Sequence, residues 1–169
     1  MKYFIIVLSL FTLVSCKKNN PGKENVQKEN DLIEVYNYEQ LENYLQSGQN
    51  QTYVVNFWAT WCKPCIKELP YFEEIQVKYQ GDIKVILVSL DFPSKLESQL
   101  IPFVADKNVQ SQVILLDDPH ENEWIPKVDT TWSGAIPATL IMKGDKRIFY
   151  ERSFTKKELE NEILKFKNI

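Results

Sequence analysis

The segment that decides the fold is residues 54–70, which reads VVNFWATWCKPCIKELP. An apolar, aromatic-rich run passes through a short turn into Cys62-Lys63-Pro64-Cys65, and a helix-forming run follows the second cysteine. At a helix start, unpaired backbone N–H groups and the positive end of the dipole stabilise a thiolate, which favours Cys62 as a reactive thiol. Cys65 comes three residues later, close enough to form a disulfide with Cys62. The segment therefore predicts a dithiol site that carries out thiol–disulfide exchange.

Length, composition and charge limit the number of domains, the class of protein and the kinds of partner that we expect. Its 169 residues correspond to one domain with appendages. Apolar residues make up 44% and charged residues 25%, which is ordinary for a soluble globular protein. The formal net charge of −3 argues against nucleic acid as a partner. We expect a monomer.

Residues 1–15 are expected to be a lipoprotein signal peptide. Lys2 precedes an apolar run of 12 residues, which is too short for a mature transmembrane helix and has the length of a signal-peptide core. The run ends in the letters LVSC, which resemble the bacterial lipobox, so Cys16 is expected to carry a lipid that anchors the chain to a membrane. The alternative is an ordinary secretory signal, or an uncleaved anchor in which Cys16 is incidental.

Residues 16–30 are expected to be the lipidated cysteine and a flexible tether. The tether has one Pro, one Gly and almost nothing to bury. Fully extended it reaches at most about 50 Å. The folded domain, residues 31–169, would therefore work close to the membrane surface.

Apolar patterns in residues 31–169 predict alternating strands and helices. Nearly continuous apolar runs at 52–58 and 83–90 are typical of central strands buried on both faces. This order predicts an α/β fold in which a central mixed β-sheet is flanked by helices on both faces. Shorter strands are predicted at 32–35, 113–116, 138–142 and 147–151. Helices are predicted at 38–46 after the cap Asn37, from the dithiol to about 80, at 95–107, at 121–128 despite Pro126, and after the capping box Thr155–Glu158.

The sequence resembles the thioredoxin superfamily and, more closely, the membrane-tethered bacterial thiol–disulfide oxidoreductases of the TlpA/ResA type. The resemblance is carried by NFWATWCKPC at 56–65, ELP at 68–70 and GAIPAT at 134–139. A lone C-x-x-C motif is weak evidence for this family, whereas the three motifs together are strong evidence. The resemblance covers the chain from Leu32 onward, with 93–133 matching least, and it implies a thioredoxin-like fold.

The resemblance also implies roles for the residues around the dithiol. Cys62 would be the attacking thiolate and Cys65 the more buried resolving thiol that releases the product. Pro64 would hold the helix start and limit access, and both Trp61 and Pro64 are expected to meet the substrate.

Ile136 and Pro137 match the position of the family's cis-proline. The residue before that proline offers backbone groups to an extended substrate, which here would be Ile136. A cis bond before proline costs little more than a trans bond, so a substrate-facing turn can contain one.

Glu68 matches a carboxylate that the tethered branch places near its dithiol. Thioredoxin has an Asp in the strand where this chain has Asn56, and that Asp helps to deprotonate the buried thiol. Because an amide cannot take a proton, the role passes either to Glu68 or to water. The alternative for Glu68 is a solvated helix residue.

Other readings of the same residues are weaker. Zinc needs about four ligands, and beyond the pair only Cys16 and His120 remain, so no metal and no cofactor are expected. A purely structural disulfide would not call for Trp61 and Pro64, and the Pro-x-x-x-Thr-x-x-Cys pattern of a peroxiredoxin is absent. His120 is expected in a loop. Trp124 and Trp132 suit either a partner-binding surface or the core.

Together these features predict a lipid-anchored, periplasm-facing thiol–disulfide oxidoreductase of the bacterial cell envelope. By analogy with the family it would reduce disulfides of exported proteins such as apocytochrome c and be recharged by an upstream membrane thiol reductant. The dipeptide Lys63-Pro64 lacks the His of strongly oxidising members, which favours reduction. The alternatives are an oxidase or isomerase of folding proteins, and a thioredoxin-fold binding module with an idle dithiol.

Overall fold

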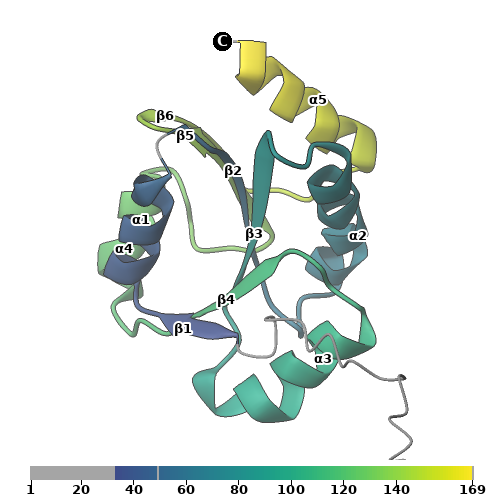
Figure 1. Cartoon of the computed structure of the whole chain (residues 1–169). Coiled ribbons are helices and arrows are strands. Elements are labelled where there is room, and N and C mark those ends of the chain that lie inside the picture. The colour runs from purple at the N-terminus through teal and green to yellow at the C-terminus, as the bar shows by residue number, and fades with distance from the viewer. Residues whose placement is uncertain (1–32, 49, 169) are drawn as a thin grey trace, which may run out of the picture.

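The computed structural model describes residues 33–48 and 50–168 of the chain (Figure 1). The predicted signal peptide, the predicted lipidation site Cys16, the predicted tether and the first residue of the strand expected at 32–35 lie outside the described residues. Within the described part, no helix is long and apolar enough to cross a membrane.

A six-stranded mixed sheet forms the centre of the described chain, in the order β1-β4-β3-β2-β5-β6. Strands β1, β4, β3 and β2 are parallel, whereas β5 pairs antiparallel with both β2 and β6. The predicted mixed sheet is therefore confirmed, with the dithiol strand at its centre. The strands are β1 Glu34–Tyr36, β2 Thr52–Trp58, β3 Ile83–Ser89, β4 Gln112–Leu116, β5 Ala138–Lys143 and β6 Lys146–Tyr150.

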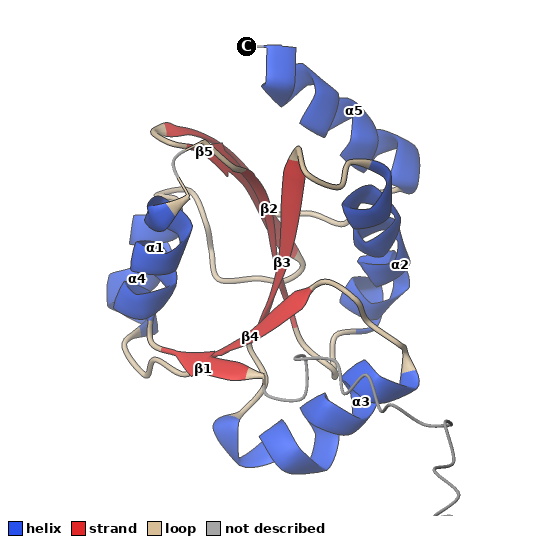
Figure 2. Cartoon of the chain, in the orientation of Figure 1, coloured by secondary structure: helices blue, strands red, loops and turns tan. Residues whose placement is uncertain are grey.

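Helices cover both faces of this sheet, as predicted. Figure 2 shows α1 and α4 on one side of the sheet and α2 and α5 on the other. The helices are α1 Tyr38–Ser47, α2 Lys63–Lys78, α3 Ile101–Asp106, α4 Glu121–Val128 and α5 Lys156–Asn168.

The strand β2 contributes side chains to two cores, one on each face of the sheet, because its side chains alternate between the two faces. Val54 and Trp58 pack into the core under α2 and α5. Val55 and Phe57 pack into the core under α1 and α4. Every residue of β2 is buried, which is the environment that its continuous apolar run predicted.

Two helix starts have the caps that the sequence predicted. Asn37 accepts the backbone N–H of Gln40, whose side chain accepts the N–H of Asn37 in return. Before α5, Thr155 accepts the N–H of Glu158, and the Glu158 carboxylate accepts both the N–H and the hydroxyl of Thr155. These reciprocal bonds satisfy donors that a helix start leaves unpaired.

The segment predicted as one helix over 95–107 differs from the expectation. It consists of a 3₁₀ turn at Pro93–Lys95, a π-helical turn at Leu96–Leu100 and the short α3. Pro102 lacks a backbone N–H and cannot donate to the carbonyl four residues before it, so a regular α-helix cannot run through this position without losing a bond. In contrast, α4 continues past Pro126 to Val128.

Candidate active site

Cys62 and Cys65 form a disulfide at the start of α2, with 5.3 Å between their α-carbons. Cys62 is the N-cap residue, and its Sγ accepts the backbone N–H of Cys65 at 3.3 Å. The N–H of Cys62 donates to the carbonyl of Ala59 at 3.1 Å, which fixes the turn between β2 and the helix. The predicted position of the first sulfur over the helix start is therefore confirmed, where N–H donors stabilise a thiolate.

The two sulfurs differ in their access to solvent. Cys62 is 5% exposed and Cys65 is fully buried. Pro64 lies in the first turn of α2, where its missing N–H costs nothing, and it is exposed beside Cys62. The side chain of Trp61 is 59% exposed. Cys65 is therefore the more deeply buried cysteine of the pair, as the resemblance implied.

The loop before β5 brings a backbone carbonyl to the disulfide. The peptide bond between Ile136 and Pro137 is cis, as the resemblance implied. The carbonyl oxygen of Ile136 lies 3.8 Å from the Sγ of Cys62, although the two residues are 74 positions apart. Ile136 is partly exposed and Pro137 is buried. An extended segment bound at Cys62 would meet this backbone.

Glu68 lies one turn after Cys65 on the buried face of α2 and is only 1% exposed. Its Oε1 accepts the side-chain N–H of Asn56 at 3.1 Å, and its Oε2 accepts the backbone N–H of Phe154 at 2.7 Å. Burial raises the pKa of this carboxyl to about 7, against the lowering effect of these two donors and of Arg152. The alternative of a solvated helix residue is wrong.

Asn56 is fully buried beside this carboxyl. Its side-chain nitrogen also lies 3.4 Å from the carbonyl of Ala138 and 3.3 Å from the hydroxyl of Thr139, both in β5. Its amide oxygen is buried and has no hydrogen-bond partner among the described residues. Asn56 thus joins Glu68 to the strand that follows the cis-proline, and it leaves one acceptor available next to a titratable acid.

Asp91 is a site residue that the sequence reasoning did not single out. It is 2% exposed, and its carboxylate accepts the backbone N–H of Thr60 at 3.0 Å and the hydroxyl of Thr60 at 2.5 Å. It also accepts the hydroxyl of Ser89 at 2.8 Å. An acidic residue directly after a buried parallel strand could have signalled this position, because the neighbouring strand ends at the same edge of the sheet.

The remaining candidate residues are His120, Trp124 and Trp132. His120 is exposed before α4, with its Nδ1 3.2 Å from Asp118. Trp124 and Trp132 are 4% and 5% exposed and pack in the core under α1 and α4, so they are not a partner-binding surface. Across the described part of the chain, no group of three or more His, Cys, Asp or Glu side chains could hold a metal ion.

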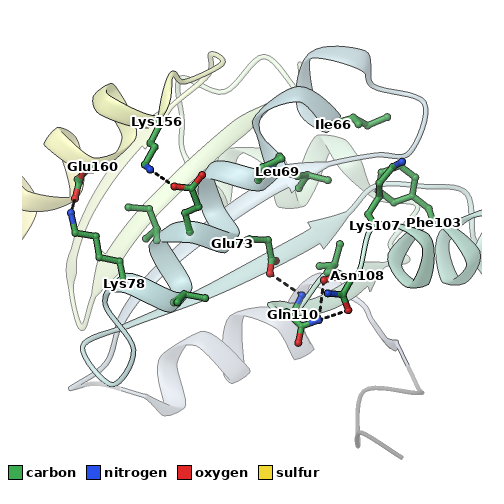
Figure 3. Close-up of a pocket in the computed structure, with 15 residues that line it drawn as sticks. Ile66, Leu69, Glu73, Lys78, Phe103, Lys107, Asn108, Gln110, Lys156 and Glu160 are labelled. Atoms are coloured by element: carbon green, nitrogen blue, oxygen red, sulfur yellow. Dashed lines mark hydrogen bonds and ion pairs between the residues drawn. The ribbon is translucent and has the colours of Figure 1, made fainter.

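A cavity of about 630 Å³ lies along the outer side of α2, beside α3 and α5 (Figure 3). Its apolar lining includes Leu69 and Phe103. On its rim, Glu73 accepts the backbone N–H of Gln110 at 2.8 Å, and Lys78 pairs with Glu160. The disulfide is not part of its lining, so this groove is separate from the dithiol site.

Comparison with known proteins finds a matching family and several similar proteins. The chain matches the AhpC/TSA family over residues 30–150. It is 32% identical to the thioredoxin-like protein YneN of Bacillus subtilis over 121 residues, which are 70% of this chain and 67% of that protein. It is 35% identical to the thiol-disulfide oxidoreductase ResA of Bacillus cereus over 82 residues, which span about half of either chain, 48% and 47%.

A solved structure supports the same fold. The thioredoxin-related protein from Neisseria meningitidis serogroup B superposes with a TM-score of 0.62 at 21% identity, over 74% of this chain and 91% of that one. The sequence-based prediction of a thioredoxin-like fold is thus confirmed. The chain belongs to the AhpC/TSA family of thioredoxin-like proteins, and the Cys62–Cys65 pair gives it the site of a thiol–disulfide oxidoreductase.

Proposed function

We propose that this thiol–disulfide oxidoreductase works in the reducing direction, on disulfides of exported proteins. The observation that carries the proposal is the arrangement at the start of α2. The less buried cysteine caps the N-terminus of the helix, the fully buried Cys65 follows it, and a buried carboxyl with a raised pKa lies one turn further on.

The first step is attack by Cys62 in the reduced protein. Its thiolate, held by the N–H of Cys65, attacks one sulfur of the substrate disulfide. A new bond joins Cys62 to that sulfur, the substrate S–S bond breaks, and the other substrate sulfur leaves as a thiolate. The carbonyl of Ile136 beside Cys62 would help to align the substrate backbone.

The second step releases the product. Cys65 loses its proton and attacks the Sγ of Cys62, so the Cys62–Cys65 disulfide forms and the second substrate sulfur leaves as a thiolate. Two electrons have then passed to the substrate. Glu68 is the proposed acceptor of the Cys65 proton, because a carboxyl with a pKa of about 7 can take and return a proton near neutral pH. Neighbouring Asn56 cannot take it.

The reducing direction is supported by the sequence between the cysteines. Lys63-Pro64 contains no His of the kind that strongly oxidising members of the superfamily carry. In this proposal an upstream membrane thiol reductant returns the pair to the dithiol. An apocytochrome c is one candidate among exported substrates. An oxidase or isomerase role is the alternative for the same residues.

The proposed location is the periplasmic side of the cell envelope, with the chain anchored through a lipid on Cys16. It is supported by the lipobox-like LVSC and the polar tether after it. Radiolabelled fatty acid should enter the wild-type protein in cells and should not enter Cys16→Ser. Equal labelling of both proteins would reject the anchor.

The reduction potential tests the direction of electron flow. The domain is equilibrated in graded thiol buffers, and the fraction of Cys62–Cys65 disulfide is measured. A value near about −270 mV, as in thioredoxin, supports reduction, and one near about −120 mV, as in a strong oxidant, rejects it. In parallel, Cys65→Ser should trap a mixed disulfide with a substrate peptide and Cys62→Ser should not. Trapping by Cys62→Ser alone would reverse the assigned roles.

A further inference from the structure

Two large aromatic side chains are exposed on the loops that follow β2 and β3. Trp61 is 59% exposed and Phe92 is 69% exposed, whereas most aromatic side chains of the two cores are buried. Phe92 is not needed in either core, since it belongs to neither cluster. Exposed rings of this size are characteristic of surfaces that bind a partner.

The Asp91 carboxylate joins the two loops that carry Trp61 and Phe92 at one edge of the sheet. It accepts the N–H and the hydroxyl of Thr60, which lies in the loop after β2. Asp91 itself lies in the loop after β3. The N–H of Leu90 also donates to the carbonyl of Trp58 at 2.8 Å. Trp61 directly follows Thr60, and Phe92 directly follows Asp91. Each aromatic residue is therefore the next residue in the chain after one partner of the Thr60–Asp91 hydrogen bond.

The loop that carries Trp61 leads directly into the reactive cysteine. Cys62 directly follows Trp61, and consecutive α-carbons are only about 3.8 Å apart. The carbonyl of Ile136 meets the Sγ of Cys62 from a different loop. A peptide whose cysteine reaches Cys62 therefore places its neighbouring side chains within reach of the rings.

We propose that Phe92, together with Trp61, binds an apolar side chain next to the cysteine of the substrate, and so makes the protein prefer disulfides flanked by apolar residues. The occupant is an extended segment of a protein substrate with an apolar residue within two positions of its cysteine. This inference rests on the proposed function, because it concerns the substrate of the same dithiol.

The test uses two disulfide-linked peptides that differ only at the residue beside the cysteine, one with Leu and one with Ser. For wild type, Phe92→Ser, Phe92→Tyr and Val77→Ser, kcat/KM is measured on both peptides, and the ratio of the two values is the preference. Val77 is the matched control, because it is 70% exposed and lies 15 helix residues, about 22 Å, from Cys62.

We expect wild type to prefer the Leu peptide by roughly five- to tenfold, the scale of one aromatic contact. The preference should disappear in Phe92→Ser and persist in Phe92→Tyr and Val77→Ser. If wild type reduces neither peptide, the proposed function fails. If it reduces both without preference, or if Phe92→Ser keeps the preference, the function stands and this inference is wrong. A loss of preference in Val77→Ser would also overturn it.

Discussion

Glu68 is a carboxylic acid whose surroundings favour its neutral form. Burial withdraws both oxygens from water, and the donors Asn56 and Phe154 compensate only in part, so the pKa rises to about 7. The unfolded chain would hold the same proton only up to about pH 4.5. Between these two values the folded protein binds a proton that the unfolded chain has released.

We therefore predict that Glu68 makes the protein less stable as the pH rises. The stabilisation from the protonated carboxyl is fully present below about pH 4.5 and is lost as the pH rises through about 7. In Glu68→Gln this dependence should be absent, so the difference in unfolding free energy between variant and wild type should change by about 3 kcal/mol over this range. Urea denaturation of the oxidised proteins from pH 4 to 8 measures it.

Glu97→Gln serves as the control, because Glu97 is an exposed glutamate. Its stability curve should run parallel to that of wild type. Parallel curves for Glu68→Gln as well would mean that the folded protein does not retain the proton, and Glu68 would then lose its proposed role as proton acceptor for Cys65.

At the scale of the elements, short polar contacts at helix starts position the site. Cys62 caps α2, Asn37 caps α1 and Thr155 caps α5. The cap of α5 matters for the site because the N–H of Phe154, directly before Thr155, donates to Glu68. The start of α5 and the dithiol helix are thus joined through one buried carboxyl.

Replacing Thr155 with Ala should destabilise the protein by about 1 kcal/mol, the usual cost of removing a helix cap. The variant loses the hydroxyl that accepts the N–H of Glu158 and donates to its carboxylate at 2.6 Å. The midpoint of urea unfolding should fall while its slope stays unchanged. Lys157→Ala, at an exposed position of the same helix, should leave the midpoint within error of wild type. Equal midpoints for both variants would show that the cap contributes nothing.

At the scale of the whole molecule, the sheet separates two cores that have no buried side chain in common, although the partly buried Ile136 packs against both. Leu41 and Ile75 are both buried, the first on α1 and the second on α2 across the sheet. Phe57 and Trp132, in contrast, lie in one core with their ring centres 4.7 Å apart.

Substitutions in different cores should therefore add, and substitutions within one core should not. We expect Leu41→Ala to cost about 2–5 kcal/mol and Ile75→Val about 0.5–1.5 kcal/mol. The double variant should equal their sum within about 0.5 kcal/mol, whereas Phe57→Leu with Trp132→Phe should deviate by more. Unfolding free energies from urea titration provide both comparisons. Strong coupling between Leu41 and Ile75 would mean that the sheet transmits packing changes from one face to the other.

What the sequence by itself determined was encoded locally. The continuous apolar run of β2 predicted a strand buried on both faces, the C-x-x-C spacing predicted the disulfide, and Thr155 with Glu158 predicted the start of α5. Each of these signals lies within a few residues of chain, where periodicity and capping operate. The cis peptide bond before Pro137 was also expected, but from the family resemblance and not from a local pattern.

The tertiary structure decided what depends on residues far apart in the chain. Glu68 follows an exposed lysine and could equally have been solvated. In the folded chain it is buried, and Phe154, 86 positions away, donates to it. Asp91 contacts Thr60, 31 positions away, only because β2 and β3 are parallel neighbours that end at the same edge. Local patterns fix the helices, the strands and the spacing of the cysteines. The surroundings that set the pKa of Glu68, and the contact between the loops after β2 and β3, arise only when the sheet assembles.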